Sequence, residues 1–112
     1  MSFSKDLKEE LRKKHVKNES VEKQLVRTAF LNYGTITDPY RRYNLQIIFK
    51  TEKNANEIVN ILSNNGITSK IIKTQKGYCL YIKDGEEISK FLAFISANSY
   101  VIKFEEVRVV RL

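Results

Sequence analysis

The sequence predicts an α+β domain of two layers, in which a four-stranded antiparallel sheet carries helices on one face. Two observations support this prediction. Segments with an apolar period of two residues occur in two pairs, which indicates two β-hairpins. Segments with an apolar period of three or four residues precede and follow each pair, which indicates helices. In this chain of 112 residues the resulting order is a leading helix followed by an αββαββα core.

A short amphipathic helix is predicted near the start, over residues 4–14. Ser4 is a suitable N-cap, because its hydroxyl oxygen can accept a hydrogen bond from a free backbone N–H of the first turn. Leu7 and Leu11 are four residues apart, so they share one face of this helix. The polar residues 15–19 that follow are typical of a connector.

A longer helix follows, from the N-cap Ser20 to Gly34, a residue type that commonly ends helices. Its apolar residues keep a helical period throughout. We therefore divide the chain into an N-terminal helix with its connector, residues 1–19, and a main domain, residues 20–112.

The first hairpin is predicted from residues 35–37 and 43–50, joined through the turn signal Asp38-Pro39. Apolar and polar side chains alternate along the second run, which is typical of a strand with one buried face. The face expected to be buried consists of Tyr43, Leu45, Ile47 and Phe49, and the other of Asn44, Gln46, Ile48 and Lys50.

The remaining elements follow in the same pattern. A helix is predicted over about residues 53–64, and a second hairpin over 67–73 and 78–83. Another amphipathic helix contains Ile88 to Ile95. The tail, residues 100–112, fits both a helical and a strand period, and we favour a helix.

Composition excludes several classes of protein. Hydrophobic residues make up 42% of the chain, which argues against disorder. No run of about 18 apolar residues indicates a transmembrane helix, and the polar start does not resemble a secretory signal. The single cysteine, Cys79, cannot form an internal disulfide, and its use fits a reducing cytoplasm.

The net charge of +7 is unevenly distributed along the chain. Residues 28–83 carry +5, against +3 for residues 1–27 and −1 for residues 84–112. A basic surplus on the predicted sheet suggests a polyanionic partner, although it is equally compatible with a merely soluble surface.

The sheet face without helices is predicted to be polar and cationic. Long amide and ammonium side chains on antiparallel strands can reach base edges and phosphates in a major groove; a solvated sheet surface is the alternative. We expect the hairpin loops to hold phosphates and the strands to face the groove. The loop residues are Arg41, Arg42, Lys73 and Lys76, and the strand residues are Asn44, Gln46, Lys50, Lys70, Tyr81 and Lys83.

The residues predict no catalytic centre, no metal site and no cofactor. His15 is the only histidine, and no nucleophile or acid stands at a spacing that would build a triad with it. The adjacent acids Glu86 and Glu87 would not face each other on a helix, so they do not form a general acid/base pair. Cys79 is expected to be a small packing residue on the outward face of its strand.

Two parts of the chain, residues 1–11 and about residues 24–111, carry motifs that occur together in a known family. The motifs of the second part are Arg27-Thr-Ala-Phe-Leu-Asn-Tyr-Gly34, Thr35-Ile-Thr-Asp-Pro39, Tyr43-Asn-Leu45, Gly66-Ile-Thr-Ser-Lys-Ile-Ile72, Lys83-Asp-Gly-Glu-Glu-Ile88 and Phe104-Glu-Glu-Val-Arg-Val-Val110. The first part resembles the start of WhiA-family proteins, which are bacterial DNA-binding regulators of sporulation and cell division, and the second part resembles their second LAGLIDADG-like repeat. The αββαββα core of that family agrees with the order predicted above.

The resemblance also has implications for assembly. Family members carry two repeats and a C-terminal helix-turn-helix domain, whereas this sequence contains one repeat. Related one-repeat homing endonucleases pair their motif helices in a symmetric dimer. The resemblance therefore implies a homodimer on double-stranded DNA, with Val26, Ala29, Phe30 and Gly34 at the helix–helix contact; packing of this helix wholly within its own domain is the alternative.

The same comparison implies a protein without nuclease activity. With Gly34 placed on the final glycine of the LAGLIDADG motif, Tyr33 falls where the nucleases keep a metal-binding carboxylate. A phenol is not a ligand that Mg²⁺ prefers. The expected function is thus a non-catalytic DNA-binding domain in the cytoplasm, associated with the nucleoid. The alternative is an interaction module that pairs with a full-length WhiA-type protein without binding DNA itself.

Overall fold

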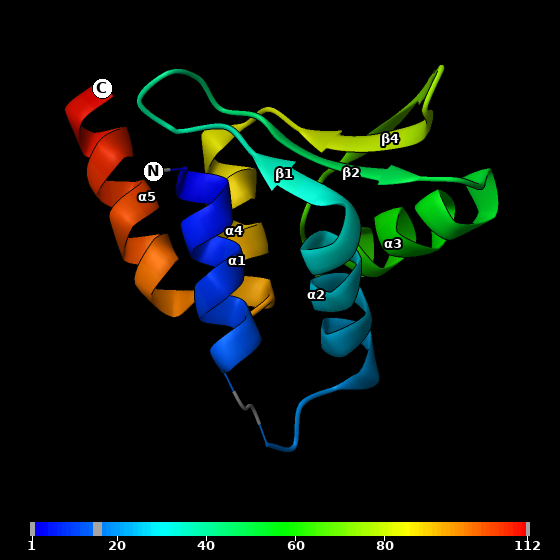
Figure 1. The fold of residues 1–112 in the computed structure, drawn as a ribbon, viewed down its shortest axis with the longest axis horizontal. Helices are drawn as coiled ribbons and strands as arrows, with labels where there is room; N and C mark the ends of the chain where they lie inside the picture. The colour runs from blue at the N-terminus through cyan, green and yellow to red at the C-terminus, as the bar shows by residue number, and fades with distance from the viewer. Residues whose placement is uncertain (1, 15–16, 112) are drawn as a thin grey trace.

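The computed structural model describes residues 2–14 and 17–111 of the chain and confirms the predicted α+β architecture (Figure 1). Met1, His15, Val16 and Leu112 lie outside the described residues. The tail forms a helix up to Arg111, as the favoured prediction had it. In chain order the elements are α1 (Phe3–Lys13), α2 (Val21–Tyr33), β1 (Gly34–Ile36), β2 (Leu45–Phe49), α3 (Glu52–Asn64), β3 (Lys70–Thr74), β4 (Gly77–Ile82), α4 (Gly85–Phe94) and α5 (Asn98–Arg111).

The four strands form one antiparallel sheet in the order β1-β2-β4-β3. Figure 1 shows the helices gathered on one side of this sheet, which leaves its other side without helices. We call that side the open face. The alternation predicted for β2 is confirmed, because Leu45, Ile47 and Phe49 are buried against the helices.

The first helix belongs to the same core as the rest of the chain. Leu7 and Leu11 of α1 are buried in one apolar cluster with residues of the sheet and of α2, α3, α4 and α5. The ring of Phe3 also packs edge-on against Tyr100 of α5, with ring centroids 5.2 Å apart. Helix α1 therefore shares one apolar core with the other described elements, and the division of the chain after residue 19 stays a prediction.

The N-cap of α1 differs from the prediction. Ser2 occupies the cap, where its hydroxyl accepts a hydrogen bond from the backbone N–H of Lys5. Ser4 lies in the first turn instead, and its Oγ accepts a bond of 3.2 Å from the backbone N–H of Ile36 in β1. The hydroxyl predicted to start the helix thus ties the helix to the edge of the sheet. Ser20 caps α2 as predicted.

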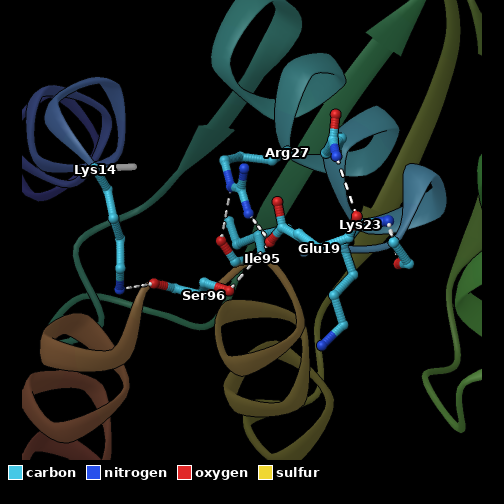
Figure 2. Close-up of polar contacts among 8 residues, drawn as sticks. Lys14, Glu19, Lys23, Arg27, Ile95 and Ser96 are labelled. Carbon is cyan, nitrogen blue, oxygen red and sulfur yellow. Dashed lines mark hydrogen bonds and ion pairs between the residues drawn. The ribbon is translucent and has the colours of Figure 1, made fainter. Parts of the chain in front are cut away.

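A buried polar cluster joins the connector to the helical layer (Figure 2). Glu19 accepts hydrogen bonds from Arg27 of α2 and from the hydroxyl of Ser96, and only 3% of its side chain is exposed. Arg27 also donates from Nε to the carbonyl of Ile95, at 3.0 Å. Lys14 donates to the carbonyl of Ser96, a residue with φ of 67° at the corner between α4 and α5. Both ends of the connector are therefore fixed to that corner.

The β3–β4 turn requires glycine at its end. Gly77 has φ of 135°, and a Cβ atom there would lie 2.3 Å from the carbonyl oxygen of Phe49. Thr74 closes the turn, because its Oγ1 donates to the carbonyl of Gly77 and accepts from the N–H of Lys76. This tight turn places the Lys76 side chain beside the end of β2.

Candidate nucleic-acid interface

The polar side chains of the open face are arranged in rows across the strands. Gln46 of β2 lies directly opposite Tyr81 of β4, which in turn lies opposite Lys70 of β3. Residues in direct register share a face of the sheet, so these three side chains lie side by side, as predicted. Lys83 follows two residues after Tyr81, and its ammonium nitrogen lies 5.4 Å from the centre of the Tyr81 ring. The ring thus gives the lysine a cation–π contact.

One end of the open face combines amides with cations. Arg42, Asn44, Gln46 and Lys83 line a hollow of about 280 Å³ there. Asn44 donates from Nδ2 to Thr37 at 3.5 Å, while its Oδ1 is buried and has no hydrogen-bond partner among the described residues. A buried amide oxygen without a partner is uncommon in proteins.

The loop between β1 and β2 presents two arginines at the same end. Asp38 organises this loop, because its carbonyl accepts from the N–H groups of Arg41 and Arg42, and its carboxylate accepts from the N–H of Tyr40. The predicted turn at Asp38 is thereby confirmed, and both arginine side chains are exposed beyond it.

A second cationic group lies at the opposite end of the open face. Lys50, at the end of β2, and Lys76, in the β3–β4 turn, line one hollow of about 320 Å³ together with Tyr33. The two ends are separated by the five-residue ladder of β2 with β4. At about 3.4 Å per residue, this ladder is roughly 17 Å long.

Lys73 does not belong to the open face. The sequence placed it in the second hairpin loop, but β3 extends to Thr74, and Lys73 pairs in register with Tyr78. Tyr78 packs against the core on the helical side, and Lys73 lies over its ring at 6.0 Å. Strand alternation therefore turns Lys73 away from the other predicted contacts, and we remove it from the candidate site.

An apolar row crosses the centre of the open face. Ile48, Cys79 and Ile72 lie opposite one another on three neighbouring strands. Cys79 is buried within this row, which agrees with a packing role on the outward side of its strand, and burial raises the pKa of its thiol. Ile72 is 54% exposed. Ile48 is an apolar residue at a position that strand alternation predicts to face the polar side, and this mismatch was the signal in the sequence for an apolar row.

Acidic side chains lie beside the row that contains Lys70. Asp84, Glu86 and Glu87 line a hollow of about 660 Å³ together with Lys70 and other residues of β3 and β4. Two of these acids are occupied by local hydrogen bonds. Asp84 caps α4 through the N–H groups of Glu86 and Glu87, and Glu87 accepts from the N–H of Thr68 and pairs with Lys90.

The helix α2 packs differently from what the resemblance implied. Val26 and Phe30 have no exposed surface and belong to the core of their own domain. Gly34 and Ala29 are also buried, and a Cβ atom on Gly34 would lie 2.4 Å from the ring of Phe30. Val26 and Phe30 therefore pack within this chain rather than projecting toward a second helix. The exposed face of α2 carries Val21, Leu25, Thr28 and Asn32.

The donor groups near Tyr33 do not suit a divalent cation. Its neighbours in the hollow include the ammonium groups of Lys50 and Lys76, whereas Mg²⁺ prefers carboxylate and carbonyl oxygens. Elsewhere within residues 2–14 and 17–111, no group of three or more His, Cys, Asp or Glu side chains could hold a metal ion. A hollow of this composition is suited to an anion such as a phosphate.

Comparison with known proteins shows to which family this chain is similar. Residues 22–112 match the model of the WhiA LAGLIDADG-like domain. The chain is 34% identical over 111 residues to a probable cell division protein WhiA of Caldicellulosiruptor saccharolyticus, covering 99% of this chain and 32% of that protein. It is 31% identical over 96 residues to the protein of the same name in Clostridium tetani, covering 86% of this chain and 30% of that protein. The chain thus spans about a third of the length of these relatives.

Two solved structures share its fold. The structure of "full-length DUF199/WhiA from Thermatoga maritima" matches with a TM-score of 0.73 and 26% identity, over 78% of this chain and 31% of that one. The N-terminal LAGLIDADG domain of DUF199/WhiA matches with a TM-score of 0.62 and 29% identity, over 66% and 40%. In the described part of the chain, no helix is long and apolar enough to cross a membrane.

Proposed function

Because this chain belongs to the WhiA LAGLIDADG-like domain family, we propose that it binds double-stranded DNA through the open face, without cleaving it, as part of a WhiA-like transcriptional regulator. The observation that carries the proposal is the charge of this face. Exposed cations stand at both ends of the β2–β4 ladder, Arg42 and Lys83 at one and Lys50 and Lys76 at the other. A bacterial protein with this activity would act at the nucleoid.

The spacing of these cations supports a duplex as the ligand. The ladder between them is roughly 17 Å long, which is comparable to a major groove about 12 Å wide with phosphates along both sides. The amide groups of Asn44 and Gln46 line the hollow at the Arg42 and Lys83 end of the ladder, where they would contact base edges next to the phosphates that these cations hold. In this arrangement the cations position the duplex and the amides contact its bases.

We further propose that two copies bind together. On the exposed face of α2, Val21 is 79% exposed and Leu25 is 40% exposed, and Thr28 and Asn32 continue the same stripe. Burying this stripe against a second α2 would remove apolar surface from water. It would also join two open faces into one surface of twice the length.

The same stripe supports a second candidate function, in which the chain pairs with a full-length WhiA-type protein and does not bind DNA. Light scattering of a mixture with such a protein, set beside a DNA titration, separates the two candidates. A mixed complex without DNA affinity would favour the second.

The salt dependence of binding tests the proposed function. Each phosphate neutralised by a cation releases counterions, so affinity falls with salt by a slope of about −0.9 per contact. We expect fluorescence anisotropy with a labelled duplex to show a steep slope for the wild type. Replacing Arg41, Arg42 and Lys76 by Ala should flatten it.

The matched control removes three cations from other places. Lys13, Lys17 and Lys103 lie on α1, the connector and α5, so their replacement by Ala gives the same net charge. This control should keep a slope close to that of the wild type. Equal slopes for the two triple variants would contradict the assignment, and Mg²⁺-dependent nicking of a plasmid by the wild type would contradict the absence of cleavage.

A further inference from the structure

We propose that the open face prefers A·T base pairs, with the apolar row Ile48–Cys79–Ile72 contacting the 5-methyl groups of thymines in the major groove. This inference rests on the proposed DNA-binding function and adds a sequence preference to it. The row lies in a hollow of about 520 Å³, which Gln46, Lys76, Tyr81 and Lys83 also line.

The position of the row argues for a ligand that is apolar at its centre and anionic at its edges. Ile72 leaves more than half of its surface in water, and Ile48 beside Cys79 is only partly covered. Lysines at both ends of the ladder frame this apolar strip. A major groove has the complementary pattern, because phosphates flank it and thymine methyl groups project from its floor.

Gln46 adds a second contact with the same preference. Its amide can bond the N6 and N7 atoms of adenine in a bidentate manner, and the partner base of that adenine is a methyl-bearing thymine. Gln46 and Ile48 are two residues apart on β2 and share the open face. Both side chains therefore face the groove floor on which that adenine and its thymine partner present these groups.

The test removes the 5-methyl groups of the thymines from the duplex and leaves the rest of the duplex unchanged. A randomised duplex pool is first enriched on the full wild-type chain, and the enriched duplex is then resynthesised with deoxyuridine in place of thymidine. Phosphates, charge and base pairing stay the same. We expect A·T pairs to be enriched, and the uracil duplex to bind about fourfold more weakly for each contacted methyl.

Two variants locate the effect on the protein. Ile72→Ala should bind the thymine and uracil duplexes more equally, because it removes one of the contacts. Ile102→Ala is the matched control, since Ile102 is similarly exposed but lies on α5, and it should discriminate as the wild type does. Both side chains are on the surface, and circular dichroism checks that both variants fold.

The outcomes separate this inference from the proposed function. Salt-dependent binding with equal affinity for thymine and uracil duplexes overturns the inference and leaves the proposed function standing. An absence of salt-dependent binding to any duplex overturns both. If Ile72→Ala instead weakens self-association and leaves the discrimination unchanged, the row is a protein contact and the inference is wrong.

Discussion

Arg27 in α2 donates a hydrogen bond of 3.0 Å from its Nε atom to the backbone carbonyl of Ile95, at the end of α4. Its guanidinium also pairs with Glu19, whose carboxylate accepts from Ser96 as well (Figure 2). The Arg27 side chain thereby links α2, which carries the exposed stripe, to the end of α4 on the other side of the helical layer.

Replacing Arg27 by Met should lower the free energy of unfolding by about 3 to 5 kcal/mol, because it leaves a buried carboxylate without its partner. Urea denaturation measures this loss. The double replacement Glu19→Leu with Arg27→Leu should recover much of it, since no buried charge remains. As a control, Arg12→Met, which removes an exposed arginine from α1, should change the stability by less than about 0.5 kcal/mol. A single variant as stable as the wild type would contradict the structural role of the cluster.

Two glycines with positive φ provide a matched pair of predictions. Gly77→Ala should destabilise the protein by more than about 2 kcal/mol, because the new Cβ would meet the carbonyl oxygen of Phe49 and the backbone would be strained. Gly66 has φ of 78° but open space around it. Gly66→Ala should therefore cost only the left-handed strain, about 1 kcal/mol. Thermal unfolding followed by circular dichroism compares the two, and equal losses would show that the close approach at Gly77 has no effect.

The free energy of unfolding should also depend on pH, through the ionisation of the Glu87 carboxyl. The hydrogen bond from the N–H of Thr68, together with Lys90, lowers the pKa of the Glu87 carboxyl below its ordinary value of 4.5. Its contribution to stability is complete above that value and is lost as the pH falls through the lowered one. We expect Glu87→Gln to be less stable than the wild type at neutral pH and the difference to shrink in strong acid. Urea midpoints at the two pH values measure it, and a constant difference would argue against the assignment.

The proposed homodimer predicts a molecular mass in solution of about twice that of one chain. Leu25→Glu places a charge in the exposed stripe of α2, so it should convert a dimer to a monomer in sedimentation equilibrium. The control Val109→Glu also replaces an exposed apolar residue, but on α5, and should leave the mass unchanged. A wild-type monomer at all concentrations would contradict the homodimer.

Most of the fold follows from local patterns in the sequence. The alternation from Leu45 to Phe49 predicted both the strand and its buried face, because the period of two residues is a direct result of strand geometry. The helix at the C-terminus was harder to predict. Its apolar residues also fit a strand period, and burial of Phe104 and Val107 against the rest of the domain favours the helix. That packing is a tertiary effect which a local pattern does not contain.

The errors have a common physical origin. Ser4 was predicted as the N-cap, but Ser2 takes that position, and the Ser4 hydroxyl bonds to the neighbouring strand β1 instead. Lys73 was assigned to the hairpin loop, but it pairs with Tyr78 in β3, and strand alternation places it on the helical side. Phe30 was assigned to an interface by resemblance, whereas the core of this single domain encloses it. Each outcome depends on contacts between elements that are distant in the sequence.

The attachment of α1 has a practical consequence for shortened versions of this protein. Its first turn bonds to Ile36, its last residues reach Ser96, and Leu7 and Leu11 are enclosed between them. A fragment trimmed to begin at Ser20 would uncover apolar surface that water now never reaches, and it should precipitate or form aggregates during purification.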